Sequence, residues 1–217
     1  MQRIFQMVGE KYGYEDVKAK FTAFRDFKVK WMRSYKWIEF DVSDYLKDAP
    51  NEVLEALAKT LFAKIKGENA SYPELVVDWL TRPDFVDRNQ PIYIRRCRGL
   101  SKTCEGANHD LFQAYERLLA KGLVDYDEQI AFRWGAIEHS VGHSSVLMKT
   151  VVISERLDSE EVSEDLLDYA LYTQLVHVGM GFNPSGEPRG GHYEEELNKY
   201  PNRVEMEDSL HEMRLRV

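Results

Sequence analysis

The sequence predicts an α+β fold in which a small twisted β-sheet packs on one buried helix, with additional helices around them. Two observations carry this prediction. Apolar and polar residues alternate along residues 27–42 and again from residue 130, a pattern typical of strands with one buried face. Residues 166–182 are apolar on nearly every side of a helix, which indicates a helix that runs through the middle of a domain.

Composition sets limits on the class of protein. The 217 residues, 43% of them hydrophobic, suffice for one sizeable domain, so we expect a single domain over 1–217. The formal net charge of −8 disfavours general binding to nucleic acid or to an anionic membrane, because phosphate contacts need a basic face. The chain has no apolar run of about 20 residues and no N-terminal leader with an apolar centre, so we expect a cytoplasmic protein without a membrane span. Cys97 and Cys104 fit neither CxxC nor zinc-ribbon spacing and are expected to be thiols in a reducing compartment.

The N-terminal part is predicted to form a hairpin between two helices. Residues 15–24 predict a short helix, and residues 27–31 and 38–42 predict the two strands of the hairpin. Apolar residues then recur at helical spacing along 50–65, and Gly67 ends the run. We therefore expect a core-facing amphipathic helix after the hairpin.

Residues 70–128 read as a helical and loop insertion whose role the sequence does not define. The expected elements are a short helix at 74–80, an extended segment at 91–97, a loop at 100–108 and a helix at 111–119. No residue pattern in this stretch indicates a particular chemistry.

The pattern changes again after residue 129. We expect a strand at 130–134, a polar loop at 136–145, a second strand at 146–154 and a long helix from about 162 to 180. The acidic, serine-containing segment just before this helix is a typical helix N-terminus, because carboxylates there complement the helix dipole. The last residues, 203–217, predict a terminal helix that packs back on the domain.

The long helix carries an unusual set of polar residues. Thr173 and His177 are four residues apart and share one face, with Gln174 beside them. In the HExxH motif of zincins, two histidines at this spacing bind zinc and the glutamate between them activates a water molecule. The segment TQLVH therefore stands where an HExxH motif would stand.

Around this helix the chain resembles the archaeal small zincin-type metallopeptidases, the minigluzincin and SprT-like group. The shared features occur in the same order along the chain: Trp134-Gly135, the strand 146–154, Leu157-Asp158, TQLVH at 173–177, the loop Gly181-Phe182-Asn183-Pro184, and His192-Tyr193-Glu194-Glu195. The resemblance covers roughly residues 130–202. It implies a zincin-like fold with a metallopeptidase-like core in that range.

Carried over residue by residue, the resemblance makes His177 the second zinc ligand and His192 the third. Thr173 stands in place of the first ligand, and Gln174 in place of the general base. A threonine hydroxyl is a poor zinc ligand, and glutamine cannot take a proton from water. Since general-base catalysis typically contributes ~10²–10⁴-fold, the standard mechanism should be badly impaired even if zinc binds.

Further residues are expected to border the cleft or a sheet edge near 146–154. An extended peptide could add to such an edge, because strand addition needs backbone groups and not zinc. The expected residues of this peptide edge are Trp134, Met148, Val151, Thr173 and Glu195.

Other candidate ligands are weaker. Glu195 offers a carboxylate near His192, although a solvated helix face is the simpler interpretation. His139 and His143 lie in the loop between the two predicted strands, and we interpret them as loop histidines rather than ligands.

These residues lead to three hypotheses of different classes. The first is a metallopeptidase homologue that has lost standard zinc-dependent hydrolysis and acts as a peptide- or protein-binding pseudoenzyme. The second is an active metal-dependent hydrolase that uses His177, His192 and a further ligand that the sequence does not identify. The third is a structural subunit of a larger complex. Zinc content and peptide cleavage separate the first two.

Overall fold

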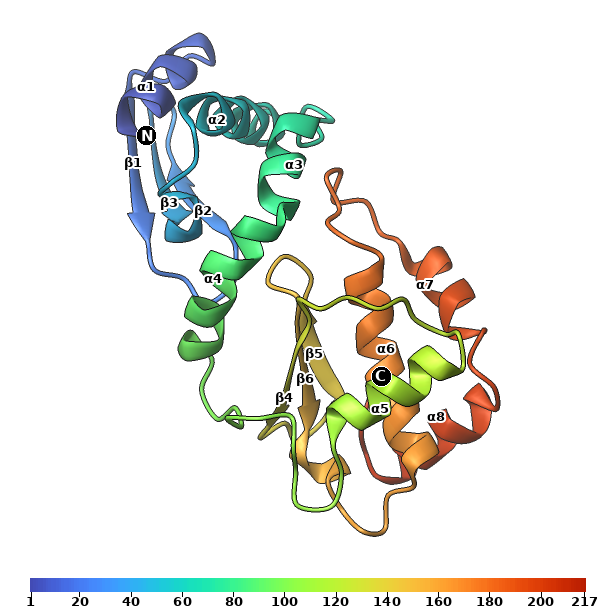
Figure 1. The fold of residues 1–217 in the computed structure, drawn as a ribbon. Coiled ribbons are helices and arrows are strands. Elements are labelled where there is room, and N and C mark those ends of the chain that lie inside the picture. Colours follow the sequence, from blue (N-terminus) through green and yellow to red (C-terminus); the bar gives the residue numbers. More distant parts are fainter. The chain divides into compact units, whose positions relative to one another are not determined.

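The structure is a computed structural model that describes residues 1–217. Helices and strands are mixed along the chain (Figure 1), which confirms the α+β class. The chain forms two compact units: unit 1 comprises residues 1–85 and 182–187, and unit 2 comprises residues 86–181 and 188–217. Folding of both as a single domain stays a prediction. No helix combines the length and the apolar character that crossing a membrane requires.

Unit 1 contains a three-stranded sheet with helices packed on it. Its elements are α1 (Gln2–Lys11), β1 (Asp16–Thr22), β2 (Val29–Arg33), β3 (Trp37–Ser43), the 3-10 turn η1 (Asp44–Leu46), α2 (Asn51–Ile65) and α3 (Glu74–Thr81). Aromatic rings join α1, β3 and α2: Phe40 meets Phe5 and Phe62 edge to face, with ring centroids 5.1 and 5.2 Å apart. The core of unit 1 therefore lies between its sheet and these helices.

The hairpin and the amphipathic helix of unit 1 are confirmed. β2 and β3 pair antiparallel, with Trp31 opposite Phe40. Helix α2 ends as predicted just before Gly67, which has a φ of +85°. Residues 182–187 join this unit through Ser185, whose carbonyl accepts a hydrogen bond from Lys64 Nζ at 3.1 Å.

The predicted helix at 15–24 is wrong, because this segment forms strand β1. It pairs parallel with β3 along its whole length, in the sheet order β1-β3-β2. Val17 and Ala19 are buried while Lys18 is exposed, which is the alternation of a strand with one buried face. Lys18 Nζ lies 3.0 Å from Glu39 of β3, an opposite-charge pair across neighbouring strands.

Unit 2 surrounds one buried helix. Its elements are most of α4 (Pro83–Arg96), then α5 (Leu111–Ala120), β4 (Ala131–Gly135), β5 (Gly142–Ser145), β6 (Thr150–Ser154), the 3-10 turn η2 (Glu155–Leu157), α6 (Glu164–Gly179), α7 (Gly190–Leu197) and α8 (Arg203–Glu212). The sheet order is β4-β6-β5, with β6 parallel to β4 and antiparallel to β5. Helix α6 packs against β5, β6, α5, α7 and α8 (Figure 1).

The long buried helix is confirmed as α6. It begins after Ser163, whose hydroxyl oxygen accepts a hydrogen bond from the Leu166 N–H at 3.2 Å and so caps the helix. Every residue from Leu166 to Val176 is buried. A helix covered on all sides has no polar face, which explains why the sequence shows no amphipathic pattern there.

The extended segment predicted at 91–97 is wrong, because these residues continue α4 to Arg96. Pro91 lies inside this helix and is exposed. A proline normally interrupts a helix, since it lacks an N–H and its ring crowds the preceding turn. Here Gln90 fixes the helix to unit 2, because its amide nitrogen donates to the carbonyls of Gln129 and Met148 at 2.7 and 2.9 Å.

The polar loop predicted at 136–145 is wrong at its end, where Gly142–Ser145 form the edge strand β5. His143 therefore lies on a strand opposite Val152 and not in a loop. A Cβ atom on Gly142 would overlap the Val152 carbonyl oxygen, so this position requires glycine for close strand approach. The following strand is shorter than predicted, because Val146–Lys149 turn the chain and only residues 150–154 pair.

A buried ionic cluster joins α5 to α6. Asp168 is fully buried on α6, and its carboxylate accepts hydrogen bonds from Arg117 at 2.7–3.1 Å and from Lys121 at 3.1 Å. Lys121 also pairs with the exposed Asp165 at 3.0 Å. Arg117 lies on α5 and Lys121 directly follows its last residue, so Asp168 fixes the position of one helix against the other.

A second carboxylate orders the loop before α5. Asp158 accepts backbone N–H groups from Ala107, Asn108 and His109 at 2.5, 2.8 and 2.9 Å. A Cβ atom on Gly106 would overlap this carboxylate, so the loop can close on Asp158 only with glycine there. Burial raises the pKa of Asp158, but the three backbone donors outweigh it and hold that pKa below its usual value.

Replacing Asp158 with asparagine should therefore flatten the acid side of the stability profile. Because the folded-state pKa is depressed, the carboxylate stabilises the fold fully above its unfolded-state pKa of about 3.9, and this contribution is lost as the pH falls through the folded-state value. We expect D158N to lower the free energy of unfolding by about 2 kcal/mol at pH 7, with the difference from wild type shrinking below pH about 3.9. Urea denaturation of wild type and D158N at pH 7 and at a pH below about 3.9 measures this. An equal loss of stability in D158N at the two pH values would contradict the role of the charge.

Candidate functional site

The polar residues of the TQLVH segment differ in exposure. Thr173 is fully buried and Gln174 is buried. The Thr173 hydroxyl donates to the Ala170 carbonyl at 2.8 Å and accepts from the Gln174 amide nitrogen at 3.2 Å. The first-ligand and general-base positions are therefore occupied by side chains that bond to their own helix.

His177 lies one turn further along α6 and is exposed. Its ring stacks on Tyr193 of α7, with centroids 4.2 Å apart and an interplanar angle of 16°. Burial lowers the pKa of His177, so the imidazole is neutral at pH 7. Burial also raises the pKa of Tyr193 to about 12, so its hydroxyl stays protonated and donates to the Thr173 carbonyl at 3.4 Å.

His192 is the third residue of α7. It is exposed, and its Nδ1 lies 3.8 Å from Glu195 Oε2. His177 contacts Tyr193, the residue that follows His192, so the two histidines come from neighbouring parts of unit 2. Glu195 is itself exposed on the surface of α7.

The side chains present do not make up a complete zinc ligand set. The hydroxyl of Thr173, in the first-ligand position, donates its hydrogen bond to the Ala170 carbonyl. No group of three or more His, Cys, Asp or Glu side chains is arranged to hold a metal ion. Zinc binding by His177 and His192 stays a prediction.

Residues 150–154 do not themselves form a sheet edge, and addition of a peptide to an edge near them stays a prediction. β6 is the central strand of its sheet, with β4 on one side and β5 on the other, so its backbone groups are already paired. Met148 and Val151 are fully buried. Trp134 is also buried, and its indole N–H donates to the Cys104 carbonyl at 2.9 Å. These three side chains belong to the interior and not to a cleft.

A cavity of about 510 Å³ opens instead at the C-terminal end of α6. Its walls come from the last turns of α6, the segment after α5, the turn before β6 and the exposed side of α7. The lining is apolar and polar in similar measure: Leu123, Val124, Ile130, Leu175, Val176, Val178, Gly179 and Met180, with the polar residues Asp125, Asp127, Lys149, His192 and Glu196. Ligand sites typically combine such apolar walls with a few polar groups.

The polar groups of the cavity are ordered by contacts within unit 2. The Tyr115 hydroxyl donates to the Asp125 carbonyl at 2.9 Å and accepts from the Asp127 N–H at 2.8 Å, which fixes this segment. Lys149 Nζ pairs with Asp127 at 2.7 Å, and Glu196 pairs with Lys199 at 2.6 Å. Asp125 is exposed and forms no ion pair, so it is the carboxylate available to a ligand.

Of the residues expected at the site, only His192 lines this cavity. The others that line it lie in four places far apart in the sequence: 123–130, 149, 175–180 and 196. In the sequence, only the two closely spaced carboxylates Asp125 and Asp127 could have drawn attention to this cavity. Nothing in the sequence indicates that their segment lies beside the end of α6.

Comparison with known proteins gives no match to a protein-family model, a curated protein or a solved structure.

Proposed function

We propose that this chain is a zincin-type metallopeptidase homologue that has lost standard zinc-dependent hydrolysis and binds peptide segments of other proteins. The observation that carries the proposal is the pairing of two features on α6. Its first-ligand and base positions are buried and bonded internally, while its C-terminal end forms one wall of a cavity lined by both apolar and polar residues. The resemblance of residues 130–202 to the minigluzincin and SprT-like group is the basis for the proposed family.

Loss of hydrolysis follows from the chemistry of these side chains. Gln174 has no group that can remove a proton from water, and the Thr173 hydroxyl already donates to a backbone carbonyl. The neutral imidazole of His177 retains a lone pair, but its ring lies against Tyr193. No step of the standard mechanism can be assigned to the residues that remain.

The cavity fits a peptide with an apolar side chain next to a basic one. The apolar side chain would pack against Leu175, Val178 and Met180. The unpaired carboxylate of Asp125 would attract a lysine or arginine, whereas Lys149 is already neutralised by Asp127 at 2.7 Å. Carboxylates therefore dominate the charge that an incoming segment meets.

Fluorescence anisotropy with labelled octapeptides tests this proposal. A peptide with a central Leu-Lys pair should bind, and replacing that lysine with glutamate or that leucine with serine should each weaken binding about ten-fold. Equal binding of all three peptides, or no binding of any, would overturn the proposed site.

The alternative hypothesis, an active metal-dependent hydrolase using His177, His192 and a further ligand, predicts a different result. Protein purified without a histidine tag would then contain near-stoichiometric zinc by mass spectrometry and would cleave peptides in a chelator-sensitive way. Metal content and cleavage are therefore measured on the same sample as binding.

A further inference from the structure

A second cavity of about 510 Å³ lies in unit 1, at the end of the β2–β3 hairpin. It is formed by the chain after α1, the hairpin turn and the end of α2. Its lining is polar and aromatic: Tyr12, Gly13, Tyr14, Glu15, Arg33, Ser34, Tyr35, Lys36 and Lys66. All of these residues belong to unit 1, and none takes part in the peptide site proposed above.

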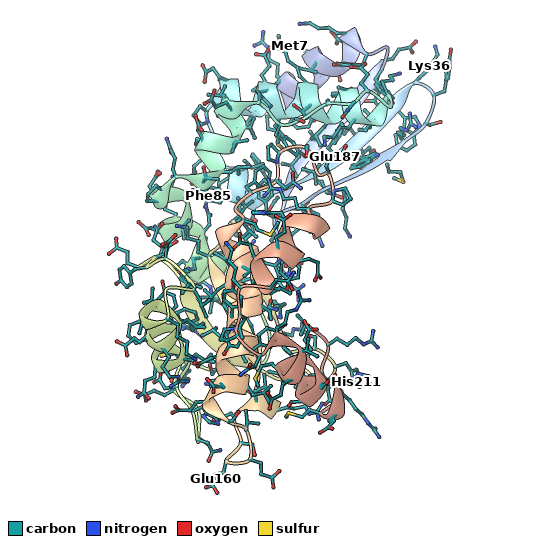
Figure 2. All side chains as sticks on the ribbon, turned by 90° about the vertical axis from the view of Figure 1, so that its right-hand side faces the viewer. Met7, Lys36, Phe85, Glu160, Glu187 and His211 are labelled. Carbon is teal, nitrogen blue, oxygen red and sulfur yellow. The ribbon has the colours of Figure 1, made fainter.

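The charge of this cavity is opposite to that of the whole chain. Arg33, Lys36 and Lys66 line it with a single carboxylate, Glu15, for a net charge of +2 in a protein of formal net charge −8. Glu15 pairs with Lys36 at 2.6 Å (Lys36 is labelled in Figure 2). Arg33 and Lys66 form no ion pair, so their charges are available to an anion.

These two free cations converge on one buried side chain. Arg33 Nη1 donates to the Tyr14 hydroxyl at 3.4 Å, and Lys66 Nζ lies 4.8 Å from the centroid of the Tyr14 ring. Because the Tyr14 hydroxyl accepts from Arg33, its own proton is available to a ligand oxygen. Tyr14 thus brings two cationic side chains to one place in the cavity.

An exposed aromatic residue stands beside this cation pair. Tyr35, in the hairpin turn, is 90% exposed. Tyr12 is partly exposed and stacks on Phe62, with centroids 5.5 Å apart. Exposed aromatic rings next to basic groups are the features on which nucleobases stack.

We propose that this cavity binds a nucleoside phosphate, with the phosphate at Arg33, Lys66 and Tyr14 and the base against Tyr35. The cavity is within the range of about 300–1,000 Å³ that small-ligand sites occupy. The ligand is a free mononucleotide and not a nucleic-acid strand, because the strongly negative chain would repel the many further phosphates of a strand.

Isothermal titration calorimetry on the full chain tests this assignment with four probes: adenosine 5′-monophosphate, adenosine, inorganic phosphate and a single-stranded decanucleotide. Adenosine monophosphate should bind, with adenosine and phosphate each at least about ten-fold weaker, since each keeps only half of the contacts. No binding of the mononucleotide, or equal binding of adenosine, would overturn the proposal. Tighter binding of the decanucleotide would also overturn it, in favour of a strand.

Substitutions locate the site. R33Q and K66Q should each weaken binding of the mononucleotide about ten-fold. Two substitutions outside the cavity are matched controls and should bind like wild type. Lys30→Gln lies on β2, the strand of Arg33, and Lys59→Gln lies on α2, the helix that ends just before Lys66. Arg33 and Lys66 are exposed, so thermal melting should be unchanged in both variants. Wild-type affinity in R33Q and K66Q would refute the site.

Discussion

Replacing Asp168 with alanine is expected to lower the free energy of unfolding by about 3 kcal/mol. The substitution leaves Arg117 and Lys121 without the buried carboxylate that accepts hydrogen bonds from both. Removing one partner of a buried ion pair typically costs about 3–5 kcal/mol, and the low end applies because the two cations keep some exposure. Urea denaturation followed by circular dichroism measures the change.

Asp165 provides the matched control for this variant. It lies one turn earlier on α6 and pairs with the same Lys121, but its side chain is 73% exposed. Exposed ion pairs contribute about 0–1 kcal/mol, so D165A should change stability little. If D165A and D168A lost similar stability, burial would not be the reason for the role of Asp168.

The variant Gly179→Leu is expected to weaken peptide binding strongly without loss of the fold. Gly179 lines the cavity at the end of α6, and a Cβ atom there would meet no atom within 4 Å. A leucine side chain would therefore occupy the space proposed for the apolar side chain of the peptide, and leucine favours a helix over glycine. Anisotropy with the Leu-Lys peptide should show affinity at least about ten-fold weaker.

Gly190 is the matched control for this substitution. It also lies in a helix of unit 2 with no atom within 4 Å of an added Cβ, but it does not line the cavity. G190L should bind the peptide like wild type. Unchanged binding in G179L, with a normal melting curve, would place the peptide elsewhere.

Two of the elements that sequence analysis predicts correctly have one strong period. Helix α2 and the β2–β3 hairpin each bury one face. Their apolar residues therefore recur about every 3.6 residues in the helix and every 2 residues in the strands. Helix α6 is recognised because its residues are apolar on nearly every side and because an acidic, serine-containing segment precedes it. In each case, local sequence and burial indicate the same structure.

The wrong predictions have a common cause, which is that distant parts of the chain decide the local structure. β1 is a strand because β3 pairs with it, and β5 is a strand because β6 does, although its sequence Gly-His-Ser-Ser has little intrinsic strand preference. Helix α4 continues past Pro91, and Gln90 there bonds to carbonyls about 40 to 60 residues away in the chain. Propensity alone does not predict these pairings.

The candidate site shows the same limit. Thr173, Gln174 and His177 could be assigned to one helix from their spacing, and the structure places them on α6. The cavity could not be predicted, because Asp125, Lys149 and Gly179 approach one another only through the packing of α5, β6 and α6. The residue pattern of one segment does not predict a cavity whose walls come from several segments.

The central claim is that this chain binds peptides without hydrolysing them. The most direct measurement incubates the untagged protein with the Leu-Lys octapeptide in zinc excess, with and without chelator, and follows the peptide by mass spectrometry. The account predicts a peptide that is retained by the protein and remains intact in both samples. Cleavage products that form with zinc and disappear with chelator would contradict it.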